Sequence, residues 1–190
     1  MASENNKMLT IIGGVNGVGK SSIYGALGAA NKNLGVVIDT DKITAKLGGD
    51  KLKGGREAVR LINECLKRGE NFTWETTLSG NKPLKTILAA REKGYIISLY
   101  YIAVSTPEES ILRIKNRVRK GGHDIPSDDV QRRYEKRFDD LIKILPHCHV
   151  VGFFDNENGF TLVGIYTNSK LKLIDEYKPD WILELKERLA

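Results

Sequence analysis

A glycine-rich segment directly after an apolar run constrains this chain more than any other feature. Residues 8–14 read MLTIIGG, and residues 14–21 read GVNGVGKS, which fits the pattern G-x-x-x-x-G-K-[S/T]. Glycines at these positions let backbone N–H groups curl around phosphate oxygens, and a helix that follows adds the partial positive charge of its N-terminus. The pattern requires a strand before it and a helix after it. The segment therefore predicts a phosphate-binding loop (the P-loop, or Walker A motif) inside an α/β fold, with a helix from Lys20 onward.

This loop is expected to bind the phosphates of a nucleotide, with ATP and Mg²⁺ as the cofactors. Lys20 is predicted to reach the β- and γ-phosphates, and the Ser21 hydroxyl is predicted to bind the metal. The predicted cofactor-binding residues run through the motif and one residue beyond it: Gly14, Val15, Asn16, Gly17, Val18, Gly19, Lys20, Ser21 and Ser22.

Short apolar runs alternate with helical patterns along the rest of the chain. The runs cover residues 8–14, 35–39, 71–77, 95–104 and 149–154. Continuous apolar runs are typical of parallel strands that are buried on both faces. Helices are predicted over 56–67, 83–93, 107–119, 126–145 and 177–189, and a hairpin that turns at 167–169 is predicted over 160–174. The pattern predicts a three-layer α/β sandwich, with a mostly parallel five-stranded sheet and a C-terminal hairpin at a sheet edge.

Length and composition indicate an ordinary globular chain. Its 190 residues suit one domain, and 41% of them are hydrophobic and 28% charged. The longest apolar stretch, 95–104, is too short to cross a bilayer, and the first residues, MASENNK, lack the apolar core of a signal peptide. Two cysteines do not make a disulfide framework, which is typical of a reduced compartment. We expect a single cytoplasmic domain over residues 1–190 that does not enter a membrane.

Most of the net charge lies in one window. The chain carries a net charge of +6, and residues 113–137 hold nine basic and four acidic residues. A solvated helix face explains many such runs, but a local basic cluster also attracts phosphates. Two glycines in the segment KGGHDIP (120–126) allow a hinge. The window therefore predicts a lid at about 113–137, with Arg117 and Arg132 or Arg133 as catalytic residues that stabilise a transferring phosphoryl group.

Several classes of nucleotide-binding protein are excluded by what the chain lacks. It contains no Asp-x-x-Gly switch and no Asn-Lys-x-Asp guanine-binding motif, and its length leaves no room for the additional domains of motor or transporter ATPases. The remaining class is the small-molecule kinase with a P-loop kinase-like fold. Such an enzyme needs a carboxylate that positions the acceptor hydroxyl and accepts its proton.

Carboxylates follow two of the predicted strands. Asp39 and Asp41 come at the end of the second strand, where the carboxyl ends of parallel strands face the ligand crevice. One is a candidate general base and the other a helix cap or magnesium ligand; both are candidate substrate-binding residues. Simple capping of a helix from Lys42 is the alternative. Glu75 lies at the end of the third strand, where a surface glutamate in a turn is the alternative to a role in substrate binding.

Several segments together resemble the zeta-toxin-like P-loop kinases, specifically a short branch with a Gly-Gly-His lid. The segments are the P-loop, IDTD (38–41), WETTLSG (74–80), RVRKGGHDIP (117–126), QRRYEKR (131–137) and FDN (154–156), with a looser match at PDW (179–181). The resemblance implies ATP-dependent phosphorylation of a hydroxyl on a nucleotide-activated sugar such as UDP-N-acetylglucosamine. It also implies Lys20 as a phosphate ligand, Asp41 as the base, Glu75 and Thr77 as sugar contacts, and Arg117 with Arg132 or Arg133 as lid arginines. After the acidic pair the chain continues Lys42-Ile43-Thr44, which departs from the larger toxins, so the reaction carries over better than the acceptor.

Other interpretations stay open beside this one. His123 is a candidate phosphate or substrate contact, although loop hydrogen bonding explains it as well. The acceptor is alternatively another small metabolite, such as a sugar acid or nucleoside. A non-kinase module that binds RNA with its basic lid is a further alternative, but acidic residues interrupt the lid, and we do not expect a nucleic-acid partner. A protein antitoxin that covers the P-loop is compatible with the kinase function.

Overall fold

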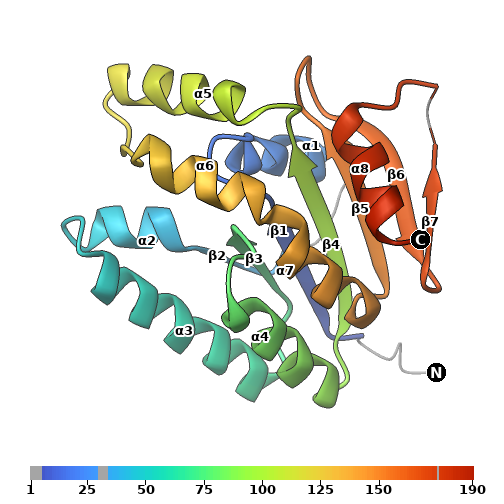
Figure 1. Ribbon diagram of the computed structural model, residues 1–190. Coiled ribbons are helices and arrows are strands. Elements are labelled where there is room, and N and C mark those ends of the chain that lie inside the picture. Colours follow the sequence, from blue (N-terminus) through green and yellow to red (C-terminus); the bar gives the residue numbers. More distant parts are fainter. Residues whose placement is uncertain (1–5, 30–33, 175) are drawn as a thin grey trace.

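The computed structural model of the protein describes residues 6–29, 34–174 and 176–190. Its strands form one sheet in the order β2-β3-β1-β4-β5-β6-β7 (Figure 1). The strand bounds are β1 Met8–Gly13, β2 Val36–Asp39, β3 Phe72–Thr76, β4 Ile96–Ala103, β5 Val150–Asp155, β6 Thr161–Thr167 and β7 Lys170–Leu173.

The five predicted strands are present and parallel, and the predicted hairpin extends the same sheet. β1 lies between β3 and β4, β2 pairs with β3, and β5 pairs with β4, all in parallel. β6 and β7 add to β5 as antiparallel strands, with an irregularity between Phe153 and Phe154. The α/β class and the mostly parallel sheet are confirmed, and the sheet has seven strands where five were predicted. The two additional strands are those of the hairpin, which was predicted at a sheet edge and pairs with β5 there.

The helices correspond to the predicted ones; α5 has the predicted bounds, and most of the others differ from the prediction at their ends. They are η1 Lys20–Ser22, α1 Ile23–Ala29, α2 Thr40–Lys46, α3 Lys51–Arg68, α4 Asn81–Glu92, α5 Pro107–Arg119, α6 Ser127–Glu135, α7 Arg137–Ile144, η2 Leu145–His147 and α8 Asp180–Arg188. The helix predicted over 126–145 is divided at Lys136 into α6 and α7. α3 begins five residues before its predicted start because the Asp50 carboxylate accepts hydrogen bonds from the backbone N–H groups of Leu52 and Lys53.

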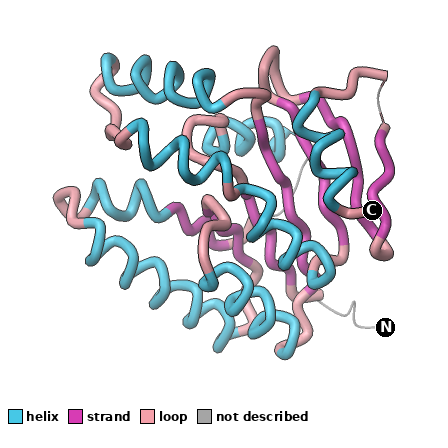
Figure 2. The backbone as a smooth tube through the Cα atoms, in the orientation of Figure 1, coloured by secondary structure: helices cyan, strands magenta, loops and turns pink. Residues whose placement is uncertain are grey.

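Helices cover both faces of the sheet and produce three layers (Figure 2). On one face, α3, α4, α7 and α8 pack on strand residues such as Ile11, Leu99 and Phe153. On the other face, Ile23 and Leu27 of α1 pack on Ile12 and Ile102. α2 follows β2 directly and α5 follows β4, so the carboxyl ends of the parallel strands open toward the space beside α2, α5 and α6. This is the edge at which the P-loop also lies.

Two findings bear on the surroundings of the protein. In the part of the chain that the structure describes, no helix has both the length and the apolar character needed to span a bilayer. Cys65 and Cys148 are both free thiols, the first buried and the second half-buried.

Candidate active site

The P-loop connects β1 to η1 and is packed too closely for side chains at its glycines. Gly17 and Gly19 have φ angles of +86° and +90°, in the left-handed region that favours glycine. A Cβ atom at Gly17 would overlap the backbone carbonyl of Ser110 in α5, and one at Gly19 would overlap the side-chain amide of Asn156. The loop is therefore held between α5 and the end of β5, and its shape depends on glycine at these two positions.

Lys20 is buried within this loop. Its Nζ donates a hydrogen bond to the backbone carbonyl of Val15 at 2.9 Å, and only 8% of the residue is exposed. Burial lowers the pKa of Lys20, and the negative charges of Glu75, Asp41 and Asp39 oppose that shift. The ammonium group thus lies next to three carboxylates instead of in water.

Glu75, at the end of β3, contacts the P-loop serine. The Ser21 hydroxyl lies 3.1 Å from both carboxylate oxygens of Glu75 and donates to them. Burial raises the pKa of Glu75, while the charge of Lys20 lowers it. The sequence predicts Glu75 as a substrate-binding residue. In the structure its carboxylate also contacts Ser21, the predicted metal ligand.

These two side chains fit a magnesium ion that is bound together with a nucleotide. Mg²⁺ in phosphoryl-transfer sites is held by one or two protein oxygens together with the phosphates, so a hydroxyl and one carboxylate suffice. Among the described residues there is no group of three or more His, Cys, Asp and Glu side chains arranged to hold a metal ion by themselves.

Asp39 and Asp41 have different environments. The Asp39 carboxylate accepts hydrogen bonds from the backbone N–H groups of Asp41 and Lys42, so it caps α2, which begins at Thr40. Within the described residues, the Asp41 carboxylate has no hydrogen bond or ion pair. Of the two aspartates, Asp39 therefore has the capping role that the sequence left open, and Asp41 is the carboxylate with unoccupied oxygens.

Two neighbouring cavities share the side chains at this edge of the sheet. The larger, of about 480 Å³, extends from the P-loop to α5, and the smaller, of about 210 Å³, lies below α6. Asn16, Lys20, Asp39, Asp41 and Glu75 line both cavities. We refer to them as the donor cleft and the acceptor pocket. The donor cleft is further lined by Gly17, Gly19, Ser21, Ser22, Lys42, Ala45, Arg113, Ile114, Arg117, His123 and Asn156. The acceptor pocket is further lined by Thr40, Trp74, Thr76, Thr77, Ser79, Lys82, Pro83 and Arg133.

The structure separates the arginines of the predicted lid. Arg117 lines the donor cleft, where its Nη2 donates to the backbone carbonyl of His123 at 2.7 Å. Arg133 lines the acceptor pocket, and its Nη1 donates to Oδ1 of Asn16 in the P-loop at 2.5 Å. Arg132 pairs with Asp129 on the exposed side of α6 and lines neither the donor cleft nor the acceptor pocket. Of the two arginines that the sequence left as alternatives, Arg133 is the one that lines the acceptor pocket.

The basic window is not one continuous surface. The buried Arg137 side chain forms an ion pair with the partly exposed Glu184 of α8 and lies over the rings of Tyr134 and Phe138. Arg113 pairs with Glu109 one turn earlier in α5. Part of the charge that suggested a phosphate-binding lid is therefore used in ion pairs within the protein.

The remaining predicted substrate residues lie in different cavities. Thr77 lines the acceptor pocket, and His123 lines the donor cleft. Between Thr77 and α4, Leu78 is buried with a φ of +60°, an uncommon conformation for a leucine. Its side chain packs against Gly13 at the end of β1, which fixes the path of the 76–80 loop beside the pocket.

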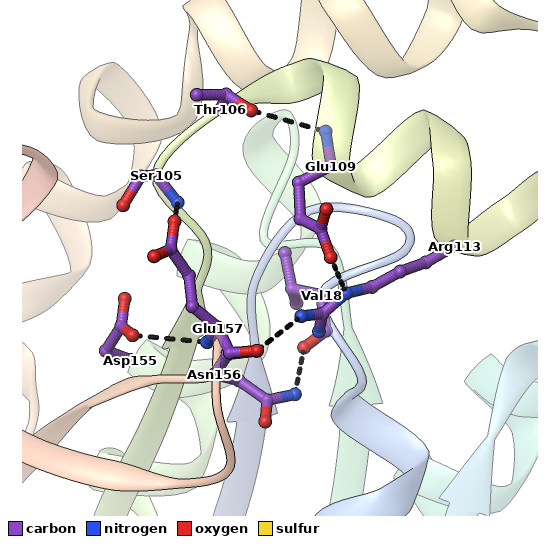
Figure 3. Close-up of polar contacts among 8 residues, drawn as sticks. All are labelled: Val18, Ser105, Thr106, Glu109, Arg113, Asp155, Asn156 and Glu157. Atoms are coloured by element: carbon purple, nitrogen blue, oxygen red, sulfur yellow. Dashed lines mark hydrogen bonds and ion pairs between the residues drawn. The ribbon is translucent and has the colours of Figure 1, made fainter.

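The sequence analysis assigned no role to Arg113 or Asn156, yet both line the donor cleft (Figure 3). The Asn156 side-chain amide donates to the Val18 carbonyl at 2.8 Å, and Arg113 Nη2 donates to the Asn156 carbonyl at 2.6 Å. The FDN segment at 154–156 was the available signal. The sequence does not indicate that β5 ends beside the P-loop.

Comparison with protein families gives one match to a family model. The model described as "AAA domain" matches residues 9–141, which run from β1 into α7. An uncharacterised protein of Haemophilus influenzae is 35% identical over 127 residues, which are 64% of this chain and 88% of that protein.

Several solved structures with a similar fold come from two-protein systems. A chain of the AvrRxo1-ORF1:AvrRxo1-ORF2 complex with sulphate ions superposes over 97% of this chain with a TM-score of 0.71 and 15% identity, and a complex with ATP gives the same values. This chain spans only 65% of those chains. A chain from the PezAT toxin-antitoxin system of Streptococcus pneumoniae gives a TM-score of 0.66 at 19% identity, over 98% of this chain and 87% of that one. At such identities the likeness shows the fold, which is the P-loop kinase-like α/β fold.

The P-loop packing leads to a prediction for Gly17→Ala. The added methyl group meets the backbone of Ser110, which cannot move without shifting α5, and alanine is strained at this φ. We expect ATP affinity to fall at least about tenfold, the order of one lost charge-assisted hydrogen bond. Titration calorimetry with ATP and Mg²⁺ measures it.

Gly55→Ala is the matched control, because nothing lies within 4 Å of the position that its Cβ would occupy and the residue is inside α3. The control is expected to bind ATP as the unaltered protein does. Equal affinities for the two variants would contradict the role of the close P-loop packing.

Proposed function

Because the chain belongs to the AAA domain family, we propose that it is a kinase that transfers the γ-phosphoryl group of ATP to a hydroxyl of a small molecule. One observation supports this more than any other. The donor cleft and the acceptor pocket are both lined by Lys20 and Asp41. A cation that can bind phosphate and a free carboxylate therefore lie on the boundary between the two cavities. A transferring phosphoryl group needs this arrangement, with donor and acceptor on either side of it.

In this proposal the P-loop and the end of β3 bind the donor. The P-loop N–H groups and Lys20 bind the phosphates, and Ser21 and Glu75 hold Mg²⁺, which when bound supplies positive charge to the phosphate oxygens. The likeness to an AvrRxo1 complex that contains ATP supports ATP as the donor. The Lys20 ammonium exchanges its bond to Val15 for a bond to phosphate, which satisfies a buried cation more fully.

Asp41 is the proposed general base. Its carboxylate is not occupied by any described group and faces both cavities, whereas Asp39 is held in the cap of α2. By capping the helix that carries Asp41, Asp39 fixes where that carboxylate lies. Asp41 then orients the acceptor hydroxyl and takes its proton as the oxygen attacks phosphorus.

Arg117 and Arg133 are the proposed lid arginines. Each lines one of the two cavities, and each now donates to an oxygen of the protein, the carbonyl of His123 and the side chain of Asn16. Gly121, with a φ of +83°, and Gly122 lie directly after α5 and provide the hinge of the lid. When the guanidinium groups turn to the phosphates, they stabilise the charge that spreads over the transferring group and displace water from it.

The proposed acceptor is a nucleotide-activated sugar such as UDP-N-acetylglucosamine. This follows from the resemblance to the zeta-toxin-like kinases, and the lining of the acceptor pocket is compatible with it. The Thr76, Thr77 and Ser79 hydroxyls suit a sugar, and Lys82 and Arg133 suit a phosphate. A further cavity of about 220 Å³, lined by Thr44, Lys51 and His123 among others, adjoins Asp41 and gives room for a larger acceptor.

A protein antitoxin is a proposed partner on the likeness to the PezAT chain alone. The P-loop edge of the sheet is the surface that it would cover. We also propose a cytoplasmic location, where ATP and nucleotide sugars are both available.

Mass spectrometry of a mixture of acceptors tests the proposed function. The protein is incubated with ATP, Mg²⁺ and a panel of nucleotide sugars, sugar acids and nucleosides. We expect one nucleotide sugar to gain the mass of one phosphate. A phosphorylated sugar acid or nucleoside would keep the kinase and change the acceptor. ATP hydrolysis that no acceptor stimulates would contradict the kinase function.

Asp41→Asn tests the general base. The amide keeps the shape of the side chain but cannot accept the proton, so we expect turnover to fall about 10²- to 10⁴-fold with ATP affinity within about twofold of the unaltered protein. Asp50→Asn is the control, since it changes a charge at the start of α3 and asparagine is an equally good cap. Unchanged turnover in Asp41→Asn would remove this residue from the mechanism.

Arg133→Ala and Arg132→Ala form a matched pair on adjacent positions of α6. Loss of the arginine that lines the pocket is expected to lower turnover about 10²-fold or more, because one cation at the transition state is removed. Loss of the exposed arginine that pairs with Asp129 is expected to change turnover less than about twofold. Steady-state rates of ADP formation at saturating acceptor measure both, and the reverse order would exchange the two roles.

A further inference from the structure

The donor cleft has a wall that the family match does not include. The match ends at residue 141, whereas Asn156 belongs to the segment after β5. This segment, residues 155–157, is called the β5 loop here. It contacts the P-loop on one side and α5 on the other (Figure 3).

Hydrogen bonds hold the β5 loop from several directions. The Asn156 N–H donates to the Ala103 carbonyl at 3.0 Å, and Arg113 donates to the Asn156 carbonyl. The Glu157 carboxylate accepts from the Ser105 N–H at 3.3 Å. These bonds come from groups on the same edge of the sheet as the cleft.

One further bond comes from the other side of the sheet. Asp155 is the last residue of β5 and is only 2% exposed. Its Oδ1 accepts from the indole N–H of Trp181 at 2.8 Å, and its Oδ2 accepts from the Glu157 N–H at 3.1 Å. One carboxylate therefore joins α8 to the turn of the β5 loop.

Trp181 is a rigid support for this carboxylate. It is 1% exposed and packs against Tyr101 and Phe153, with ring centroids 6.2 and 6.5 Å away. These residues belong to the face of the sheet that α7 and α8 cover, opposite the face of α1. Trp181 does not line the donor cleft, and the side chain to which it donates a hydrogen bond is Asp155, so Asp155 is its polar connection toward the cleft.

We propose that Asp155, held by Trp181, is a positioning residue for the phosphoryl donor: it sets the turn of the β5 loop that places Asn156 against the P-loop. The Asn156 amide donates to the Val18 carbonyl, which keeps that oxygen turned away from the phosphates and leaves the loop N–H groups free to face them. A displaced β5 loop releases Val18 and opens the wall of the cleft between Gly19 and Arg113. This inference rests on the proposed function, because it concerns the binding of ATP.

Asp155→Asn is the primary test. The Trp181 indole and the Glu157 N–H donate to different oxygens of the carboxylate. In asparagine one of these two atoms is an NH₂ group, so one of the two donors faces another donor and loses its hydrogen bond. We expect the Kd for ATP with Mg²⁺, measured by calorimetry without an acceptor, to rise about tenfold, the order of one lost hydrogen bond to a charged group. The kcat at saturating ATP and the KM for the acceptor are expected to stay within about twofold.

Trp181→Phe is the second variant, in case Asp155→Asn does not fold. It keeps the aromatic packing and removes only the indole donor, so a rise in the Kd for ATP of a few-fold is expected. In the double variant the two effects are expected to be less than additive, because both substitutions break the same connection.

Leu185→Ala is the matched control on α8. The substitution removes a fully buried apolar side chain of the same helix and leaves the hydrogen bond between Trp181 and Asp155 in place. We therefore expect it to lower the Tm without a change in the Kd of the folded protein for ATP. Asp155→Asn and Trp181→Phe variants that lose stability as this control does, with an unaltered Kd, would overturn the positioning role alone. An unaltered protein that binds no ATP would overturn the proposed function together with it.

Discussion

The rest of the site depends on the electrostatic attraction between the buried ammonium group of Lys20 and the carboxylates around it. A cation that is removed from water needs compensating negative charge, and Glu75, Asp41 and Asp39 provide it from the ends of two neighbouring strands. Asp39 and Glu75 are register partners in β2 and β3, so the sheet itself brings their carboxylates together beside the P-loop. Burial of these charges is costly when no nucleotide and metal ion balance them. This edge of the sheet is therefore better suited to binding a ligand than to forming a packed core.

The lid shows how the same residue type serves two purposes within a few turns. Arg117 in the donor cleft and Arg133 in the acceptor pocket each donate a hydrogen bond to one oxygen of the protein, which a phosphate oxygen can replace. Arg137 is fixed by an ion pair and two aromatic rings, and its role is to join α7 to α8. Tyr134 also anchors α6, because its hydroxyl donates to the carbonyls of Val104 and Ser105. Because α6 is attached to the sheet in this way, we propose that movement on closure is concentrated in the hinge after α5.

Local signals in the sequence predicted much of this arrangement. The P-loop, the apolar runs and the hairpin follow from spacing and residue type, since each depends on neighbours within a few residues. The start of α3 and the division between α6 and α7 were missed, because a single cap at Asp50 and a break at Lys136 leave no periodic pattern. The identity of the lid arginine was also beyond the sequence. Arg132 and Arg133 are adjacent and chemically equal, and only the orientation of α6 on the sheet separates them.

By itself, the sequence determined a phosphate-binding loop after a buried strand, an α/β fold, and a carboxylate pair at the next strand end. These are properties of short segments, where backbone conformation and charge are decided by residues close together in the chain. The tertiary structure alone decided that Glu75 contacts Ser21, that Asp41 lines both cavities, and that β5 ends beside the P-loop. Those facts depend on the order and register of parallel strands, which are set by packing among residues up to about 140 positions apart, such as Val18 and Asn156.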